Sequence, residues 1–172
     1  ASPSDLEIAV KGANQALKNS GWRDLLPHLR ARFLYRMGEL IDADAEKLSQ
    51  IQMSDNGKTI RECRTMIADA ARCFRYYAGI CETLEDIVTP SRGDYLSIAV
   101  SEPIGIVGAI TPWNSPALLE ANKLAPILAA GNCAILKPSE VTSLIALEYA
   151  RIGEKAGLPA GVLSVITGAG NV

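Results

Sequence analysis

The length, composition and charge of the chain restrict the class of protein to which it can belong. Its 172 residues suffice for one substantial hydrophobic core. Hydrophobic residues make up 48% and charged residues 21%, which matches an ordinary globular domain and excludes a disordered or fibrous protein. A net charge of −2 gives no basic surface for nucleic acid, and no apolar run reaches the roughly 18 residues that a membrane span needs. We therefore expect no nucleic-acid or membrane partner. Because the first residues lack the features of a secretory signal, we expect a cytoplasmic protein.

Residues 1–93 predict a mainly helical segment. The Ser4-x-x-Glu7 spacing is typical of a capping box at the start of a helix. Pro27 suits the first turn of a second helix, and Gly57 suits the end of a third. The apolar residues recur at steps of three and four. The predicted helices span residues 5–18, 27–41, 44–54 and 58–84.

Residues 94–172 predict alternating strands and helices. Short apolar runs bounded by turn residues are typical of strands that are buried on both faces. These predicted strands span residues 104–110, 133–136 and 162–166, with helices at 116–130 and 142–156 and a weaker strand at 95–100. Loops this short imply parallel pairing. The predicted fold is α/β: a helical layer followed by a parallel βαβαβ half of a Rossmann-like doubly wound sheet, within a single partial domain over 1–172.

The cysteines and the histidine are poorly spaced for a metal centre. The cysteines form no CxxC pair, and His28 has no Cys or His neighbour at ligand spacing. We therefore expect no bound metal and interpret all four thiols, those of Cys63, Cys73, Cys81 and Cys133, as core residues.

Ligands of open α/β sheets bind at the carboxyl ends of the strands, where three loops are predicted here. In the loop over 111–116, two prolines stiffen the backbone around Trp113 and Asn114. The Asn114 amide could donate to an oxyanion, or it could cap the helix that follows. Trp113 could contact a ligand or serve only in packing.

The other two loops are less specific. Lys137 and Glu140 flank Pro138-Ser139, where they could hold a ribose or form a surface ion pair. Gly168-x-Gly170 could begin a phosphate-binding turn, although ordinary turn chemistry explains it equally well.

Several motifs in order resemble the aldehyde dehydrogenase superfamily, and the resemblance covers essentially the whole chain. The matching stretches are residues 55–58, 74–79, 102–114, 123–132, 136–140 and 156–162.

The resemblance implies a role for each loop residue. Asn114 would be the oxyanion-hole donor, rather than a helix cap. Glu140 would also repel a 2′-phosphate, which favours NAD over NADP. The implied cofactor contacts are Ile110, Thr111, Pro112 and Trp113 beside the nicotinamide, Lys137 and Glu140 at the adenosine ribose, Gly168 and Ala169 at the adenine, and Ser139 at an unspecified part of the cofactor.

The resemblance also implies what the chain lacks. The family uses a cysteine thiolate and a glutamate-activated water to oxidise an aldehyde to a carboxylic acid. No residue here lies in either motif, so we expect a fragment that is inactive alone. The family's oligomerisation hairpin is also expected to be absent, although the complete protein would form a homodimer or homotetramer. A CoA-acylating semialdehyde dehydrogenase and a non-catalytic nucleotide-binding or assembly module remain alternatives.

Overall fold

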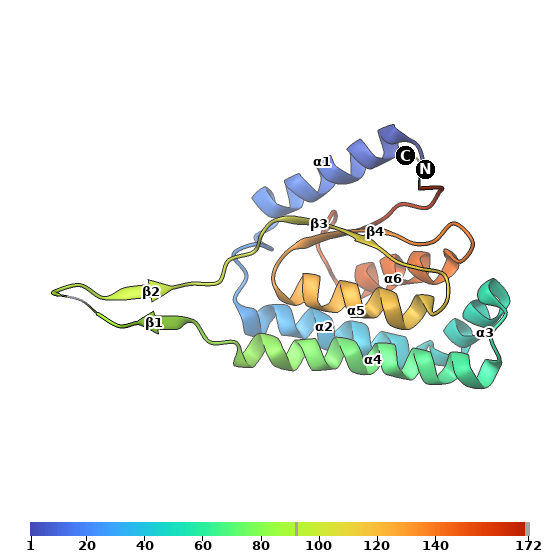
Figure 1. Cartoon of the computed structure of the whole chain (residues 1–172). Coiled ribbons are helices and arrows are strands. Elements are labelled where there is room, and N and C mark those ends of the chain that lie inside the picture. The colour runs from blue at the N-terminus through green and yellow to red at the C-terminus, as the bar shows by residue number, and fades with distance from the viewer. Residues whose placement is uncertain (92, 171–172) are drawn as a thin grey trace.

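The structure is a computed structural model that describes residues 1–91 and 93–170. Figure 1 shows its elements, in chain order: α1 (Pro3–Asn19), α2 (Pro27–Ala43), α3 (Ala45–Asn56), α4 (Ile60–Thr83), β1 (Ile87–Thr89), β2 (Ser97–Ala99), β3 (Ile106–Ile110), α5 (Pro116–Ala129), β4 (Cys133–Lys137), α6 (Leu144–Lys155) and β5 (Leu163–Val165).

The first helix begins earlier than the sequence predicted. Ser2 is the N-cap of α1, and its backbone N–H donates to the Asp5 carboxylate at 2.7 Å. The predicted capping pair, Ser4 and Glu7, was therefore wrong. The acidic side chain at Asp5 lies in the first helical turn, where it also interacts favourably with the helix dipole.

The parallel sheet confirms the predicted fold class. Its strand order is β3-β4-β5, and both pairs are parallel, with Ile106 opposite Cys133 and Ala134 opposite Leu163. Helices α5 and α6 connect successive strands, as the alternating pattern predicted. The central strand β4 is buried along Cys133–Leu136, which explains why it appears in the sequence as an uninterrupted apolar run.

An antiparallel hairpin formed by β1 and β2 confirms one expectation and corrects another. Ile87 pairs with Ala99 and Thr89 with Ser97, so the weak strand predicted at 95–100 is observed as β2, in a sheet separate from β3-β4-β5. The chain also contains a hairpin where none was expected. Figure 1 shows it extending away from the helices, and its side chains at Ile87 and Ile98 are 66% and 52% exposed.

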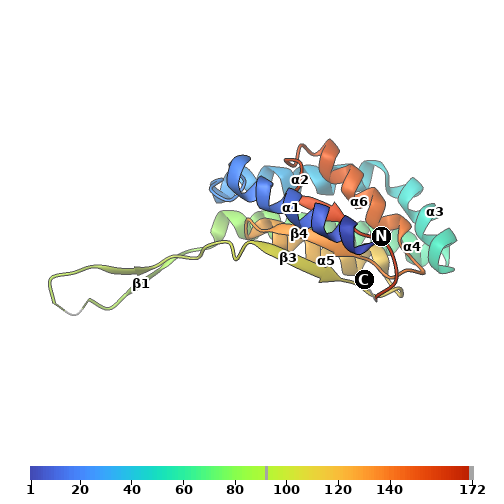
Figure 2. The same cartoon turned by 90° about the horizontal axis from the view of Figure 1, so that it is seen from above.

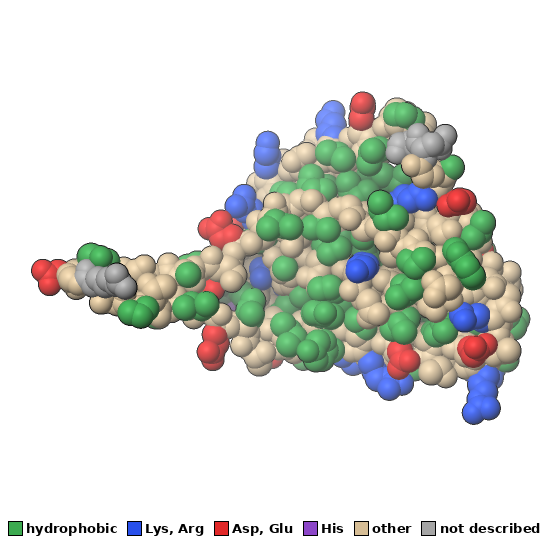
Figure 3. Space-filling view, viewed as in Figure 1, with side chains coloured by type: hydrophobic (Ala, Val, Ile, Leu, Met, Phe, Trp, Pro, Cys, Tyr) green, Lys and Arg blue, Asp and Glu red, His purple; other side chains and the backbone are tan. Residues whose placement is uncertain are grey.

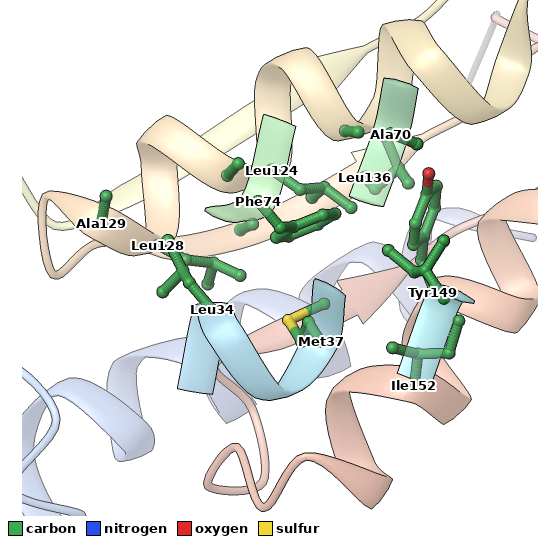
Figure 4. Close-up of a cluster of buried hydrophobic side chains, with 14 of the residues drawn as sticks. Leu34, Met37, Ala70, Phe74, Leu124, Leu128, Ala129, Leu136, Tyr149 and Ile152 are labelled. Atoms are coloured by element: carbon green, nitrogen blue, oxygen red, sulfur yellow. The ribbon is translucent and has the colours of Figure 1, made fainter. Parts of the chain in front are cut away.

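The helices cover the parallel sheet in layers. Figures 1 and 2 show α1 on one face of the sheet and α5 and α6 on the other, with α2 and α4 beyond them. Buried side chains from five elements meet in the core between these layers, among them Met37, Phe74, Leu124, Leu136 and Tyr149 (Figure 4). Within residues 1–91 and 93–170, no helix combines the length and apolarity that crossing a bilayer requires.

Candidate active site

A groove of about 430 Å³ lies at the carboxyl edge of the parallel sheet. We call it the sheet-edge groove. The ends of β3 and β4, the segment after β5 and the beginning of α1 form its walls. The residues that line it are Ala1, Leu6, Gly108, Ala109, Ile110, Ile135, Lys137, Ile166, Thr167, Gly168, Ala169 and Gly170.

Four of the predicted cofactor residues converge on this groove: Ile110, Lys137, Gly168 and Ala169. The sequence interpretation missed the contribution of the first residues: Ala1, which precedes α1, and Leu6, in the first part of α1, both form part of the wall. No local signal in the sequence marks these two residues, because only tertiary packing brings the beginning of α1 to this edge.

The loop after β3 presents the side chains of Trp113 and Asn114 to solvent. Asn114 is exposed, and Trp113 is 60% exposed, so Trp113 is not a core packing residue. Neither residue lines the sheet-edge groove, nor does buried Thr111 or exposed Pro112. The loop instead continues from Ile110, which does line the groove. It therefore starts at the groove and leads away from it.

Asn114 does not cap the helix that follows. The N-cap of α5 is Ser115, whose hydroxyl donates to the backbone carbonyl of Asn114 at 2.8 Å. Among the residues that the structure describes, the Asn114 side chain has no hydrogen-bond partner. Its amide is therefore available to a ligand.

A hydrogen bond joins the loop after β3 to the segment after β4. The hydroxyl of Thr142, a buried residue, donates a hydrogen bond of 3.4 Å to the backbone carbonyl of Trp113. The segment that follows β4 thereby supports the backbone next to Asn114. A change in one loop should consequently move the other.

Lys137 and Glu140 form the ion pair that was one of their two predicted interpretations. Their Nζ and Oε2 atoms are 3.5 Å apart, and the Glu140 side chain is 58% exposed. A hydrogen bond from its own backbone amide, followed by the Lys137 charge, lowers the pKa of Glu140, which keeps it anionic at neutral pH. Such an exposed pair contributes little to stability. Ser139 accepts a bond from the Val141 amide at 3.4 Å and so shapes the same turn.

Gly168 lies where the third loop passes close to the start of α1. Its φ is +140°, and a Cβ atom there would approach the Ala1 nitrogen to 3.0 Å. The position therefore favours glycine on both counts. Together with Ala169 and Gly170 it leaves backbone, rather than side chains, facing the groove.

The cysteines are unsuited to act as nucleophiles here. Cys63, Cys81 and Cys133 are buried, and burial raises the pKa of Cys133 to about 11, so its thiol remains protonated at neutral pH. Cys73 is half-buried, and its thiol donates to Asn122 Oδ1 at 3.2 Å. Three of the four thiols are thus core residues as predicted, and the fourth lies at the edge of the core. No metal-binding cluster of His, Cys, Asp and Glu occurs among residues 1–91 and 93–170.

Comparison with known proteins establishes the family. The model of the aldehyde dehydrogenase family matches residues 1–172. The chain is 42% identical over 163 residues to (Z)-2-((N-methylformamido)methylene)-5-hydroxybutyrolactone dehydrogenase of Acinetobacter baylyi, an alignment that covers 94% of this chain and 33% of that protein. The chain belongs to the aldehyde dehydrogenase family.

Solved structures agree in fold. The NAD-dependent aldehyde dehydrogenase of Sinorhizobium meliloti superimposes with a TM-score of 0.97 at 34% identity, covering 99% of this chain and 34% of that one. PnpE, solved in complex with nicotinamide adenine dinucleotide, gives a TM-score of 0.95 at 34% identity, covering 98% and 34%. The chain therefore spans about a third of the length of the relatives that it matches.

Proposed function

We propose that this chain is part of an enzyme that oxidises an aldehyde to a carboxylic acid with NAD as the hydride acceptor. The observation that carries the proposal is the Asn114 amide, which is exposed and has no hydrogen-bond partner among residues 1–91 and 93–170, on a stiff loop that leads from the sheet-edge groove. An amide donor aimed at the reacting carbonyl stabilises the negative oxygen of a tetrahedral adduct.

The residues at the groove fit a dinucleotide. Lys137 supplies a cation and Gly168 an open backbone, while Ile110 supplies an apolar wall. We assign Lys137, Ser139 and Glu140 to the adenosine ribose, and Gly168 and Ala169 to the adenine. Ile110 and the three residues that follow it, Thr111, Pro112 and Trp113, face the nicotinamide side.

The preference for NAD over NADP rests on Glu140. Its carboxylate is anionic at neutral pH and largely exposed beside Lys137. An anionic side chain at the ribose accepts bonds from the diol and repels a 2′-phosphate. The structural relative solved with nicotinamide adenine dinucleotide supports this choice.

In the proposed reaction, the residues of this chain bind and orient. When bound, the dinucleotide accepts the hydride that leaves the aldehyde carbon. Asn114 donates its side-chain N–H to the oxygen that becomes negative, and it exchanges no proton. The nucleophilic cysteine and the glutamate that activates water come from the remainder of the protein. Residues 1–172 alone are therefore expected to be inactive and to bind NAD weakly.

The proposal extends to the assembly and location of the complete protein. Residues 1–172 would form part of one domain, because the core joins side chains of both halves of the chain. The exposed apolar side chains of the β1–β2 hairpin, visible in Figure 3, support a homodimer or homotetramer. The four free cysteines fit a reducing compartment and hence the cytoplasm.

The proposed function is tested with the complete protein that contains this chain. We expect NADH to form in the presence of NAD and small aldehydes, with one equivalent of carboxylic acid. NADH formation that requires added CoA, with acyl-CoA as the product, would instead identify the acylating alternative. The absence of NADH formation with a broad panel of aldehydes would contradict the proposed activity.

A further inference from the structure

Both backbone polar groups of Ala117 are bound by side chains from other helices. The Ala117 N–H donates to Gln52 Oε1 of α3 at 3.0 Å. The hydroxyl of Tyr149, in α6, donates to the Ala117 carbonyl at 2.6 Å. Ala117 and Gln52 are fully buried, and Tyr149 is 2% exposed. We call Gln52 and Tyr149 the Ala117 clamp.

The Gln52 bond of the clamp replaces an ordinary helix cap. The first N–H groups of a helix have no partner within it, and the N-cap side chain usually satisfies one of them. Ser115, the N-cap of α5, makes no such bond, because its hydroxyl is directed to the Asn114 carbonyl. Pro116 has no N–H to satisfy. The first available donor is that of Ala117, and the bond to it comes from a different helix.

Tyr149 is suited to remain a donor. Burial, and then the nearby Glu120 carboxyl, raises the pKa of Tyr149 well above its usual range. Its ring also packs against Phe74 of α4, with centroids 5.9 Å apart, so the hydroxyl is held in place from the core.

The position of the clamp connects it to the candidate active site. Ala117 lies three residues after Asn114, and the intervening Pro116 restricts the backbone between them. On the other side of Asn114, Thr142 holds the carbonyl of Trp113. We propose that Gln52 and Tyr149 are positioning residues that aim the Asn114 amide by fixing the first turn of α5. This inference rests on the proposed function.

Two substitutions at Gln52 and one at Tyr149 test the clamp. Gln52→Leu removes the acceptor at similar volume, together with the 3.4 Å bond that the Gln52 amide nitrogen donates to Met66 Sδ, and Gln52→Glu keeps an acceptor oxygen. Tyr149→Phe removes only the hydroxyl. Ser49→Ala is the matched control, because Ser49 is equally buried in α3 but bonds only the Ala45 carbonyl of its own helix.

The first measurement is the rate of aldehyde oxidation by the complete protein. We expect Gln52→Leu and Tyr149→Phe to lower kcat by roughly ten- to a hundredfold, because a donor displaced by about 1 Å loses most of its effect. The Kd for NAD should not change. Gln52→Glu should recover most of the rate, and Ser49→Ala should retain it.

A double-mutant cycle separates aiming from general damage. If the clamp acts through Asn114, Gln52→Leu should cause no further loss of kcat in an Asn114→Ala background. Equal losses in both backgrounds would overturn the proposal, as would failure of Gln52→Glu to recover the rate.

Hydrogen exchange gives a second measurement that does not depend on activity. The amide of Ala117 should exchange faster in Gln52→Leu than in the unsubstituted protein, while the amides of the last turn of α5 keep their rates. Unchanged exchange at Ala117 would show that the clamp does not hold this turn. If the unsubstituted protein oxidised no aldehyde, the proposed function and the aiming role would both fail, and the exchange result would still decide whether the clamp exists.

Discussion

The indole N–H of Trp22 donates a hydrogen bond of 3.1 Å to the backbone carbonyl of Asn132, which lies 110 residues further along the chain. The Asn132 side chain in turn accepts a bond from the Gly105 amide at 2.9 Å. Trp22 is 1% exposed and packs edge-on against Phe33. One side chain of the helical segment thereby fixes the point at which both β3 and β4 begin.

Replacing Trp22 by Phe should destabilise the fold. The substitution keeps an aromatic ring but removes the buried N–H and part of the packed volume. We expect a loss on the order of 1–3 kcal/mol, seen as a lower midpoint of thermal unfolding of the complete protein. Trp113→Phe is the matched control, since Trp113 is exposed and its loss should leave the midpoint unchanged. Equal midpoints for both variants would contradict the role of Trp22.

Replacing Asn114 by Ala should impair the chemical step. Loss of one oxyanion donor costs about 10²–10³ in rate. Because the donor acts on the transition state, kcat and kcat/KM should fall together, while the Kd for NAD stays the same. Asn14→Ala is the control, because Asn14 is an exposed helical asparagine that bonds only the Val10 carbonyl of its own helix. Full activity of Asn114→Ala would remove this residue from the proposed mechanism.

Replacing Glu140 by Gln should relax the preference for NAD over NADP. The substitution keeps a hydrogen-bond acceptor for the ribose but removes the charge that repels a 2′-phosphate. The ratio of kcat/KM for the two cofactors measures the effect. Glu154→Gln removes an exposed carboxylate from α6 and should leave the ratio unchanged. An unaltered ratio in Glu140→Gln would exclude Glu140 from reading the ribose.

Glu120 makes stability depend on pH. Both of its carboxyl oxygens are buried, and among the described residues neither has a hydrogen-bond partner. Burial, and then the neighbouring Asp55, raises the pKa of Glu120 to about 9. An unfolded chain loses this proton near pH 4.3. Between about pH 4.3 and 9 the folded state therefore holds a proton that the unfolded state releases, and the free energy of unfolding falls as pH rises.

Replacing Glu120 by Gln should remove this dependence. We expect Glu120→Gln to raise the unfolding midpoint at pH 8, by an amount that corresponds to a few kcal/mol, and to have a much smaller effect at pH 5. Thermal unfolding at the two pH values measures the difference. The exposed control Glu154→Gln should shift neither midpoint. An equal gain at both pH values would show that ionisation of Glu120 is not the cause.

The regular elements could be predicted because their causes are local. The helix predicted at 44–54 is observed at Ala45–Asn56, and its end follows from Gly57, whose φ is +75°. The buried run at 133–136 likewise predicted β4. The β1–β2 hairpin was missed because its strands have three residues each, which is too short for a clear alternation, and most of their side chains are exposed.

The candidate site was only partly predictable, because several of its features depend on tertiary contacts. Nothing local places α1 against the third loop. Tertiary packing also brings α1 close to the segment before β5, where a Cβ at Gly161 would meet the Gly12 carbonyl oxygen at 2.4 Å. The clamp residues Gln52 and Tyr149 also lie far from Asn114 in sequence. The burial of Glu120, by contrast, could have been predicted from the sequence, because Glu120 lies on the same helical stripe as the apolar residues Ala117 and Leu124.

The two outer strands of the parallel sheet have consequences for handling the isolated chain. Within the described residues, β3 and β5 each pair with β4 alone, so each offers a row of backbone N–H and C=O groups along its other edge. Such rows are templates for pairing with another molecule. Many hydrophobic side chains also lie on the face that Figure 3 shows. Residues 1–172 expressed alone should therefore associate as their concentration increases. Light scattering would detect this association before circular dichroism detected a change in secondary structure.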